Sequence, residues 1–319
     1  MKALFATLLA LLCLSDAVVG QEERPRNRFD HDILVETFGY NRDTPASVDF
    51  DHLYQGCPAR DCIPAIDQPS YVDADAAAAF LSDDSLVMAI DHNGDKRAWP
   101  IYVLDFHEIV NDTIGGDPIA ITWCPLCGSG LAFLRVVEGE VTEFGVSGVL
   151  HDSDLVMYDR KTDSLWQQIT GEAIMGPALG QKLTEVPIAM TEWGRWREQH
   201  PDTRVLARDT GFDMPYSEQR RYGTYEESDR LMFPAANRDL SVHPKSVVHG
   251  FRIDGHALAV MDDSLNDGPI QTTLGARELT VRRNDDGHVT AIEANGTEHV
   301  GTRLFWFAWF NFNPDTQRL

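Results

Sequence analysis

Two cysteines separated by two residues form the part of the sequence best suited to chemistry. Cys124 and Cys127 lie in the segment ITWCPLCGSG, residues 121–130, after a β-branched run and before a glycine-rich turn. Such a pair can form a reversible disulfide, or it can bind a soft metal ion through two thiolates. It can also be a structural disulfide that closes a tight turn. All three alternatives stay open at this point, and we favour metal binding.

A histidine in the preceding element is the best candidate for a third ligand. His107 lies in the segment DFHEIVND, and we expect the chain to turn back across NDTIGGDP so that His107 lies beside the cysteines. A Cys2His cluster with an open position suits copper or zinc, and we predict copper more than zinc. His151 and His249 are weaker candidates for completing the coordination. The main enzymatic alternative is thiol–disulfide exchange at Cys124 and Cys127.

A stretch that mixes charged and aromatic residues could form the wall of a pocket. Its candidates are Asp112, Arg160, Trp166 and Glu172. A third hypothesis is therefore a non-enzymatic binding module, with the aromatic-rich stretches around Trp166 and Trp306 as its surface. The sequence contains no serine-hydrolase elbow, phosphate-binding loop or dinucleotide fingerprint. Because these motifs are absent, the sequence predicts none of the reactions that they carry out.

The N-terminal residues predict export. Residues 1–20 begin with Lys2, continue with a short apolar run and end in small residues, which is the pattern of a cleaved signal peptide. The run is too short to span a bilayer, and we find no transmembrane segment later in the chain. We expect a soluble protein that is periplasmic or extracellular. Thiols there are oxidised or bound to metal, so we also predict a disulfide between Cys57 and Cys62.

The charge of the chain excludes one class of partner. The sequence has 50 acidic and 27 basic residues, which gives a formal net charge of −23 at pH 7. A protein this acidic, with no basic stripe, repels the phosphate backbone of nucleic acids. We predict no nucleic-acid partner, and the sequence identifies no other partner.

The pattern of short elements predicts an α+β protein that is predominantly β, with a few short helices. After a polar N-terminal arm, residues 21–47, come short β-branched segments such as SLVMAI, DPIAITW and DLVMYD, separated by turns such as DHNGD and IGGD. Frequent turns between short strands favour this class over βαβ repeats. Helices are expected at residues 73–84 and 191–202.

The second part of the chain repeats a pattern of the first. Gly94 and Ala98 correspond to Gly255 and Ala259, and Trp196 precedes PDTRVL by the same spacing as Trp309 precedes PDTQRL. We therefore predict an internal duplication. The first β-rich unit, residues 48–210, carries the cysteine pair. The second unit, residues 211–319, has no cysteine, and we predict that it serves only as scaffold.

Three longer stretches carry a resemblance to a known family. They start at RAWPIYVLDFHEIVNDTIGG, continue through FGVSGVLHDSDLVMYDRKTD and end at FWFAWFNFNPDTQRL. Over roughly residues 48–319 the chain resembles the DUF3179 family of uncharacterised proteins. The resemblance implies no particular reaction. Where relatives are expected to have glycines, this chain reads GCPARDCIPA, which implies that Cys57 and Cys62 are a local addition.

Overall fold

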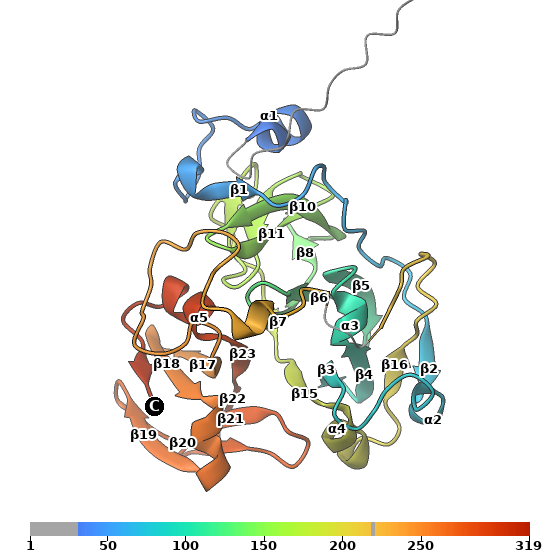
Figure 1. The fold of residues 1–319 in the computed structure, drawn as a ribbon, viewed down its shortest axis with the longest axis vertical. Helices are drawn as coiled ribbons and strands as arrows, with labels where there is room; N and C mark the ends of the chain where they lie inside the picture. The colour runs from blue at the N-terminus through green and yellow to red at the C-terminus, as the bar shows by residue number, and fades with distance from the viewer. Residues whose placement is uncertain (1–30, 218–220) are drawn as a thin grey trace, which may run out of the picture.

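The computed structural model describes residues 31–217 and 221–319 of the chain. It is predominantly β, with six sheets in the described residues and only short helices between them. The predicted fold class is thus confirmed. Figure 1 shows the sheets arranged as three groups, with the N-terminal helix at one end of the molecule and the C-terminal strands at the other.

The first unit is built on a five-stranded sheet with the order β15-β3-β4-β16-β2. Its strands are β2 Tyr71–Asp73, β3 Leu86–His92, β4 Asp95–Pro100, β15 Ala189–Glu192 and β16 Arg204–Leu206. Strand β3 is buried over Val87–Ile90, as its continuous apolar run predicts. It turns into β4 at Asn93 and Gly94, both of which have positive φ angles and fit a two-residue hairpin turn.

The cysteine pair lies in a second, four-stranded sheet of this unit, with the order β14-β7-β6-β5. Its strands are β5 Ile109–Ile114, β6 Asp117–Cys124, β7 Ser129–Leu134 and β14 Glu185–Val186. Strands β5 and β6 are antiparallel around Gly115 and Gly116, so the chain does turn back in the hairpin that the sequence predicts.

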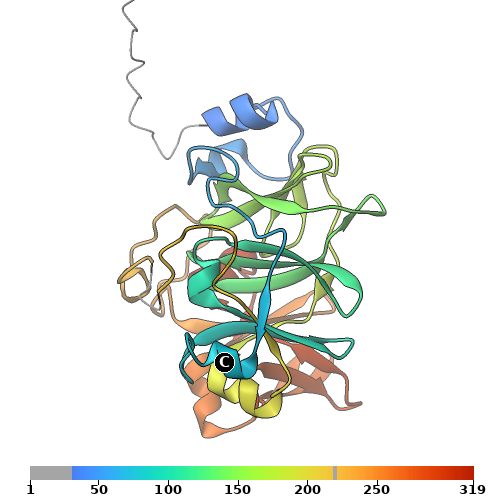
Figure 2. The ribbon, with the colours of Figure 1, turned by 90° about the vertical axis from the view of Figure 1, so that its right-hand side faces the viewer.

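A third sheet, with the order β1-β10-β11-β12-β13, packs beside the cysteine sheet. Its strands are β1 Leu53–Gln55, β10 Phe144–His151, β11 Asp154–Asp159, β12 Leu165–Gln167 and β13 Ala173–Met175. A small ribbon of β8 Val136–Val137 and β9 Glu140–Val141 leads into it. Figure 2 shows this sheet above the cysteine sheet, with β1 joining it from the N-terminal side.

The second unit contains two further sheets, with the orders β23-β17-β18-β24 and β19-β20-β21-β22. The first consists of β17 Val247–Ile253, β18 His256–Met261, β23 Thr302–Phe305 and β24 Gln317–Arg318. The second consists of β19 Ile270–Leu274, β20 Arg277–Arg283, β21 Val289–Glu293 and β22 Glu298–Val300. The 3-10 helix η3 Asp262–Asp267 connects β18 to β19.

Two sheets of the first unit match the two sheets of the second in strand order and strand direction, apart from the extra edge strand β2. In the first unit the hairpin of β3 and β4 has β15 as an antiparallel neighbour and β16 as a parallel one. In the second unit the hairpin of β17 and β18 has β23 as an antiparallel neighbour and β24 as a parallel one. Each parallel strand follows a seven-residue helix, α4 Trp193–Gln199 or α5 Trp306–Phe312. Whether the two units arose by duplication stays a prediction.

The helices repeat one detailed contact. The indole N–H of Trp196 donates to the Thr203 hydroxyl at 3.1 Å, and that of Trp309 donates to the Thr316 hydroxyl at 2.9 Å. Besides the edge strand β2, the first unit has one long segment that the second unit lacks. Strands β8–β13 lie between β7 and β14, whereas β21 continues directly to β22.

The described part of the predicted N-terminal arm, residues 31–47, packs against the protein. It contains α1 Asp32–Phe38, whose Ile33, Leu34 and Phe38 are buried against the sheet of β10–β13. The prediction of a loosely held polar arm is therefore wrong for this part, because these three apolar residues share one helical face. Residues 21–30 and the predicted signal peptide, residues 1–20, lie outside the described residues.

The predicted helices form, though one is shorter than expected. Helix α2 covers only Ala74–Ala77, and the Asp73 side chain caps it by accepting from the Ala76 N–H at 2.7 Å. Helix α4 ends before Pro201, as expected. Two other short helices are α3 Ile101–Leu104 and the 3-10 helix η1 Phe50–His52. Within residues 31–217 and 221–319, no helix combines the length and apolar character that crossing a bilayer requires.

The long connection between the units packs against both of them. Among the described residues of this connection, 207–217 and 221–246, there is one short regular element, the 3-10 helix η2 Tyr225–Glu227. Tyr216 joins the core around β3 and β4, whereas Tyr225 joins the core that contains the cysteines. The connection therefore covers the cysteine loop.

Candidate metal centre

The cysteine loop is a tight, buried turn between β6 and β7. Cys124 ends β6 and pairs with Ser129 of β7. The Cys127 N–H donates to the Cys124 carbonyl at 3.2 Å, and Pro125 occupies the second position of the turn, where its fixed φ angle is favourable. Both cysteine side chains are buried, at 1% and 0% exposure. The turn therefore directs two thiols into the protein interior.

The second unit holds this loop in place. The backbone N–H of Phe305, in β23, donates to the Cys127 carbonyl at 2.8 Å. Its ring packs over Gly128, where a Cβ atom would lie 2.8 Å from the ring. Gly128 also has a φ angle of +59°. Both observations require glycine at this position.

A carboxylate, that of Asp154, lies beside the two thiols. The sequence analysis did not identify this residue. It begins β11 after a two-residue turn, Asp152 and Ser153, in which both φ angles are positive. One donor atom each from Cys124, Cys127 and Asp154 lies within 4.8 Å of the others. Both thiols also point at the Ser153 carbonyl, at 4.0 Å from Cys124 Sγ and 3.4 Å from Cys127 Sγ.

One oxygen of the Asp154 carboxylate has no hydrogen bond. Its Oδ2 accepts from the Gln167 side-chain amide and from the Ile169 N–H at 3.0 Å. Its Oδ1 is buried and has no hydrogen-bond partner among the described residues. Buried polar atoms nearly always have a partner, because leaving one without costs about 1–3 kcal/mol. Such an atom beside two thiols is a place where a cation would be stabilised.

The electrostatic surroundings of the thiols are acidic. Burial raises the pKa of Cys124 and Cys127, and the negative charge of Asp154 raises the pKa of both further. Burial also raises the pKa of Asp154 to about 6 and that of Glu108 to about 8. Reactive cysteines need positive surroundings that stabilise a thiolate. These thiols have the opposite environment, which a bound cation would reverse.

A small cavity reaches the centre from one side. It has a volume of about 150 Å³ and is mostly apolar. Cys124, Glu108 and Tyr222 line it, and so does Cys57. Glu108 lies just before β5 with a φ angle of +58°, an uncommon conformation for a residue other than glycine. One of the two thiols is thus reached from this cavity.

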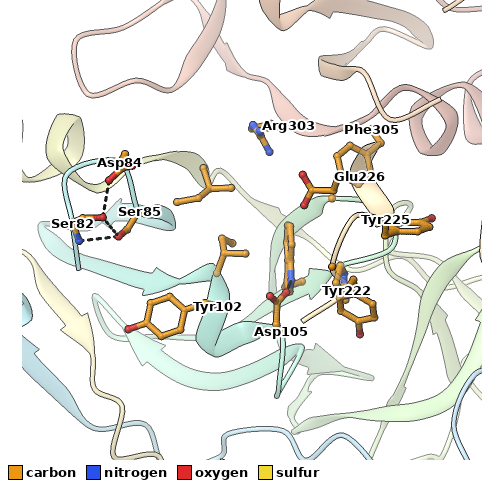
Figure 3. A pocket seen from close by; sticks show the side chains of 16 residues that line it. Ser82, Asp84, Ser85, Tyr102, Asp105, Tyr222, Tyr225, Glu226, Arg303 and Phe305 are labelled. Carbon is orange, nitrogen blue, oxygen red and sulfur yellow. Dashed lines mark hydrogen bonds between the residues drawn. The ribbon is translucent and has the colours of Figure 1, made fainter. Parts of the chain in front are cut away.

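A larger cavity lies on the other side of the cysteine loop, between the two units. Its volume is about 290 Å³, and Pro125 and Gly128 form part of its wall. Figure 3 shows Arg303 and Phe305 facing the side of Tyr102 and Asp105 across this space. Neither thiol lines this cavity. It therefore borders the backbone of the loop and not the candidate ligands.

His107 is not in the metal centre, contrary to the prediction. Its Nδ1 lies 2.7 Å from the Pro64 carbonyl, and its Nε2 is hydrogen-bonded to the Tyr216 hydroxyl. The hairpin forms as predicted, but this side chain packs between two loops. Because both ring nitrogens have partners there, His107 is a structural histidine, and burial lowers its pKa.

The two weaker histidine candidates also lie apart from the thiols. His249 is buried in the second unit, with Nε2 2.7 Å from the Asp262 carboxylate. His151 pairs with Asp154 across the turn, but its Nδ1 contacts the Gln167 side chain at 2.5 Å. Its donor atoms belong to a different group, with His52 and Asp152.

The predicted pocket residues do not share a pocket. Asp112 accepts from Arg97 and Tyr71, and Arg160 binds Asp67 and Glu143. Glu172 forms an exposed ion pair with Lys182. Trp166 is buried and donates to Asp159 at 2.9 Å, and Trp306 is also buried. The rings of Trp166 and Trp306 fill the core, so neither tryptophan offers its ring as a binding surface, and a binding module built on the stretches around them stays a prediction.

Cys57 and Cys62 lie as a disulfide pair, with their Cα atoms 6.4 Å apart. This separation is within the range that disulfides adopt. The small loop that they close is hydrogen-bonded to β10, since the Gly56 and Asp61 N–H groups donate to the Gly148 and Val146 carbonyls at 2.9 and 2.8 Å.

The residues that the sequence analysis missed carry one recognisable signal. Asp154 and Gln167 lie in strands of the inserted segment, and their proximity to the cysteines depends on tertiary packing. The segment HDSD, however, forms a two-residue hairpin turn without the usual asparagine or glycine. Aspartate tolerates the left-handed region, but serine does so less readily, and strain of the kind found at Ser153 occurs most often at functional sites.

Comparison with known proteins places the chain among relatives without an assigned activity. The family model described as "Protein of unknown function (DUF3179)" matches residues 60–316, which include the cysteine loop, the HDSD turn and both units. No curated protein and no solved structure matches the chain. The match covers most of the sequence, and the chain therefore belongs to the DUF3179 family.

Proposed function

We propose that the protein binds a borderline or soft metal ion at Cys124, Cys127 and Asp154. The observation that carries this proposal is the convergence of two buried thiols on the buried Asp154 carboxyl, whose pKa the thiols lower and whose Oδ1 has no other partner among the described residues. A donor atom of each of the three side chains lies within 4.8 Å of the others. A metal ion would coordinate that oxygen and both sulfurs, and it would compensate their charge.

The donor set favours zinc. Copper(I) is bound by sulfur ligands, whereas Zn²⁺ accepts both thiolate and carboxylate. Since Asp154 takes the place that His107 was expected to fill, an oxygen donor replaces a nitrogen donor. We therefore rank zinc above copper. Three protein ligands leave a fourth position, which is the arrangement of zinc sites that bind water or a substrate. The cavity that Cys124 and Glu108 line gives access to that position.

Thiol–disulfide exchange is the less favourable alternative at the same residues. Both thiols are buried and lie beside Asp154, whose charge raises the pKa of each. The thiolate fraction at neutral pH is then small, and the thiolate is the attacking species.

Elemental analysis of natively purified protein tests the proposal. We expect about one zinc ion per wild-type chain and less than a tenth of that in Cys124→Ser and Asp154→Asn. Asp159→Asn is the matched control, because Asp159 is equally buried at the other end of β11. It should keep its metal. Circular dichroism of each variant confirms that it is folded.

Cobalt substitution and thiol counting complete the test. Co²⁺ bound by Cys124 and Cys127 should give a sulfur-to-metal charge-transfer absorption that Cys127→Ser lacks. A Cys124–Cys127 disulfide in native protein, together with no metal, would favour redox chemistry. Two free thiols that do not bind Zn²⁺ or Cu⁺ on reconstitution would overturn both functions.

We also propose that the protein is exported after removal of residues 1–20. The disulfide geometry of Cys57 and Cys62 supports this proposal, because such bonds persist in oxidising compartments. N-terminal sequencing of protein from cells that express the full chain should find a mature start near Gln21. Alkylation under denaturing conditions should label Cys124 and Cys127 only. An intact N-terminus with five labelled thiols, Cys13 among them, would contradict export.

A further inference from the structure

A second group of ligand-type side chains lies on the other side of the HDSD turn. His52, His151 and Asp152 each offer one donor atom, and these atoms lie within 4.8 Å of one another. His151 and Asp152 are nearly buried, whereas the His52 side chain is 43% exposed. This group therefore differs from the thiol centre in having access to solvent.

Backbone pairing holds the three residues together. Strand β1 pairs with the end of β10, with Leu53 opposite His151, and this places His52 beside the turn. The Asp152 N–H donates to the His52 carbonyl at 3.4 Å. From the second unit, the Asn311 side-chain amide donates to Asp152 Oδ2 at 3.3 Å. The positions are thus set by one sheet, that of β1 and β10, and by helix α5 of the second unit.

The hydrogen bonds of Gln167 determine which nitrogen of His151 is available. A carboxylate oxygen accepts, so the Gln167 amide nitrogen must face Asp154, where it donates to Oδ2. The Gln167 amide oxygen therefore faces His151 and accepts from Nδ1–H at 2.5 Å. His151 is held with its proton on Nδ1, and the lone pair on Nε2 points toward Asp152. Metal-binding histidines are oriented in this way.

The spacing of the donor atoms fits a shared ion better than hydrogen bonds. His151 Nε2 lies 3.7 Å from Asp152 Oδ2, and His52 Nδ1 lies 3.9 Å from Asp152 Oδ1. Both separations are too long for hydrogen bonds. Two ligand atoms that are each about 2.1 Å from one ion, at a tetrahedral angle, lie about 3.4 Å apart. Small side-chain movements would bring all three onto one ion.

We propose that His52, His151 and Asp152 form a second metal site, which takes a divalent transition-metal ion such as Zn²⁺ from solvent. Two imidazoles and one carboxylate are ligands that such ions accept, with further positions left for water. Gln167 is a positioning residue, since it orients both His151 and the Asp154 carboxylate of the buried centre. The second site does not depend on the cysteines, and it can be present whether or not they bind metal.

Equilibrium dialysis of the full chain against Zn²⁺ tests the second site. Wild-type protein should bind one ion at this site in addition to any at the thiols. His52→Asn and Asp152→Asn should weaken that ion at least tenfold. His52 is half exposed, and asparagine tolerates the left-handed backbone of Asp152, so both variants should fold. His92→Asn is the control, because His92 also lies against a carboxylate, that of Asp117 at 2.7 Å.

Co²⁺ separates this proposal from the thiol centre. The ion lost in His52→Asn should contribute no sulfur-to-metal charge-transfer absorption, and Cys124→Ser should keep it. If His52→Asn and Asp152→Asn bind Zn²⁺ with the same stoichiometry and affinity as wild type, the second site is overturned, whatever the cysteine variants show. Equal loss in His92→Asn would overturn it as well, because binding would then be nonspecific.

Discussion

Glu108 is a carboxyl group in an apolar cavity, and its pKa of about 8 follows chiefly from burial. In the unfolded chain a glutamate releases its proton near pH 4.3. Between these two values the folded state keeps a proton that the unfolded state has lost, so the free energy of unfolding should fall as pH rises. Each pKa unit corresponds to about 1.4 kcal/mol, so the loss by pH 8 reaches a few kcal/mol.

Glu108→Gln tests this pH dependence in metal-free protein. Glutamine has no proton to lose, so the variant should lose a few kcal/mol less stability than wild type between pH 5 and pH 8. Urea unfolding at pH 5, 6.5 and 8 measures the difference. Glu198→Gln, at an exposed position of α4, should follow wild type. If the free energies of unfolding of Glu108→Gln and wild type differ by the same amount at all three pH values, the raised pKa of Glu108 is contradicted.

The buried thiols predict a steep pH dependence of metal binding. Burial raises the pKa of Cys124 and Cys127, so each must release its proton before it coordinates. Between pH 6 and pH 8 the apparent affinity should rise about a hundredfold per pH unit, because two protons leave for each ion. Below pH 6 Asp154 should add a third proton, since its pKa is about 6. Competition with a chromophoric chelator measures the slope, and a pH-independent affinity would exclude thiolate coordination.

Single residues also mark the limit of what the sequence could predict at the site. Spacing alone identified Cys124 and Cys127, because a turn brings close neighbours together. His107 was a reasonable third ligand by hairpin geometry, and the hairpin exists. The direction of its side chain, however, depends on Pro64 and Tyr216, which come from distant loops. Asp154 reaches the thiols only through packing of a separate sheet.

At the level of elements, the cysteine turn is shaped by a contact from the second unit. Gly128 combines a left-handed backbone with the close approach of the Phe305 ring. Gly128→Ala should therefore lower the free energy of unfolding by more than the backbone strain alone, which is about 1 kcal/mol. Overpacking adds about 1–3 kcal/mol. Urea unfolding should give a total loss of about 2–4 kcal/mol.

Gly223→Ala is the control for that measurement. Gly223 has a φ angle of +57°, close to the +59° of Gly128, but no atom lies within 4 Å of its added Cβ. It should cost only the backbone strain of about 1 kcal/mol. Equal losses in the two variants would mean that the ring of Phe305 moves aside without cost.

Most strands were predictable because their apolar runs and turn residues are local signals. The turns at Asn93–Gly94 and Gly115–Gly116 form as the sequence indicates. Helix α2 is shorter than its alanine-rich sequence suggests, because short helices depend on packing more than on propensity. The helix α1 was missed, since its apolar residues form only one short run and a single phenylalanine within a charged stretch.

At the scale of the whole molecule, the two units should respond alike at equivalent positions. Trp196 and Trp309 each donate to a threonine seven residues later. Thr203→Val and Thr316→Val should each leave a buried indole N–H without its partner, which costs about 1–3 kcal/mol. Urea unfolding of the two variants should give losses within about 1 kcal/mol of each other. If only one variant loses stability, the equivalent hydrogen bonds of the two units do not contribute equally to the free energy of unfolding.

The inserted strands β8–β13 carry most of the candidate ligands. Asp154, Gln167, His151 and Asp152 all lie in this segment, whereas both thiols lie in the part that has a counterpart in the second unit. A chain without the segment would keep both thiols in their turn but would lose the oxygen donor that we propose for them. The two sheets that position the thiols and the sheet that completes the proposed site are thus separable parts of one fold.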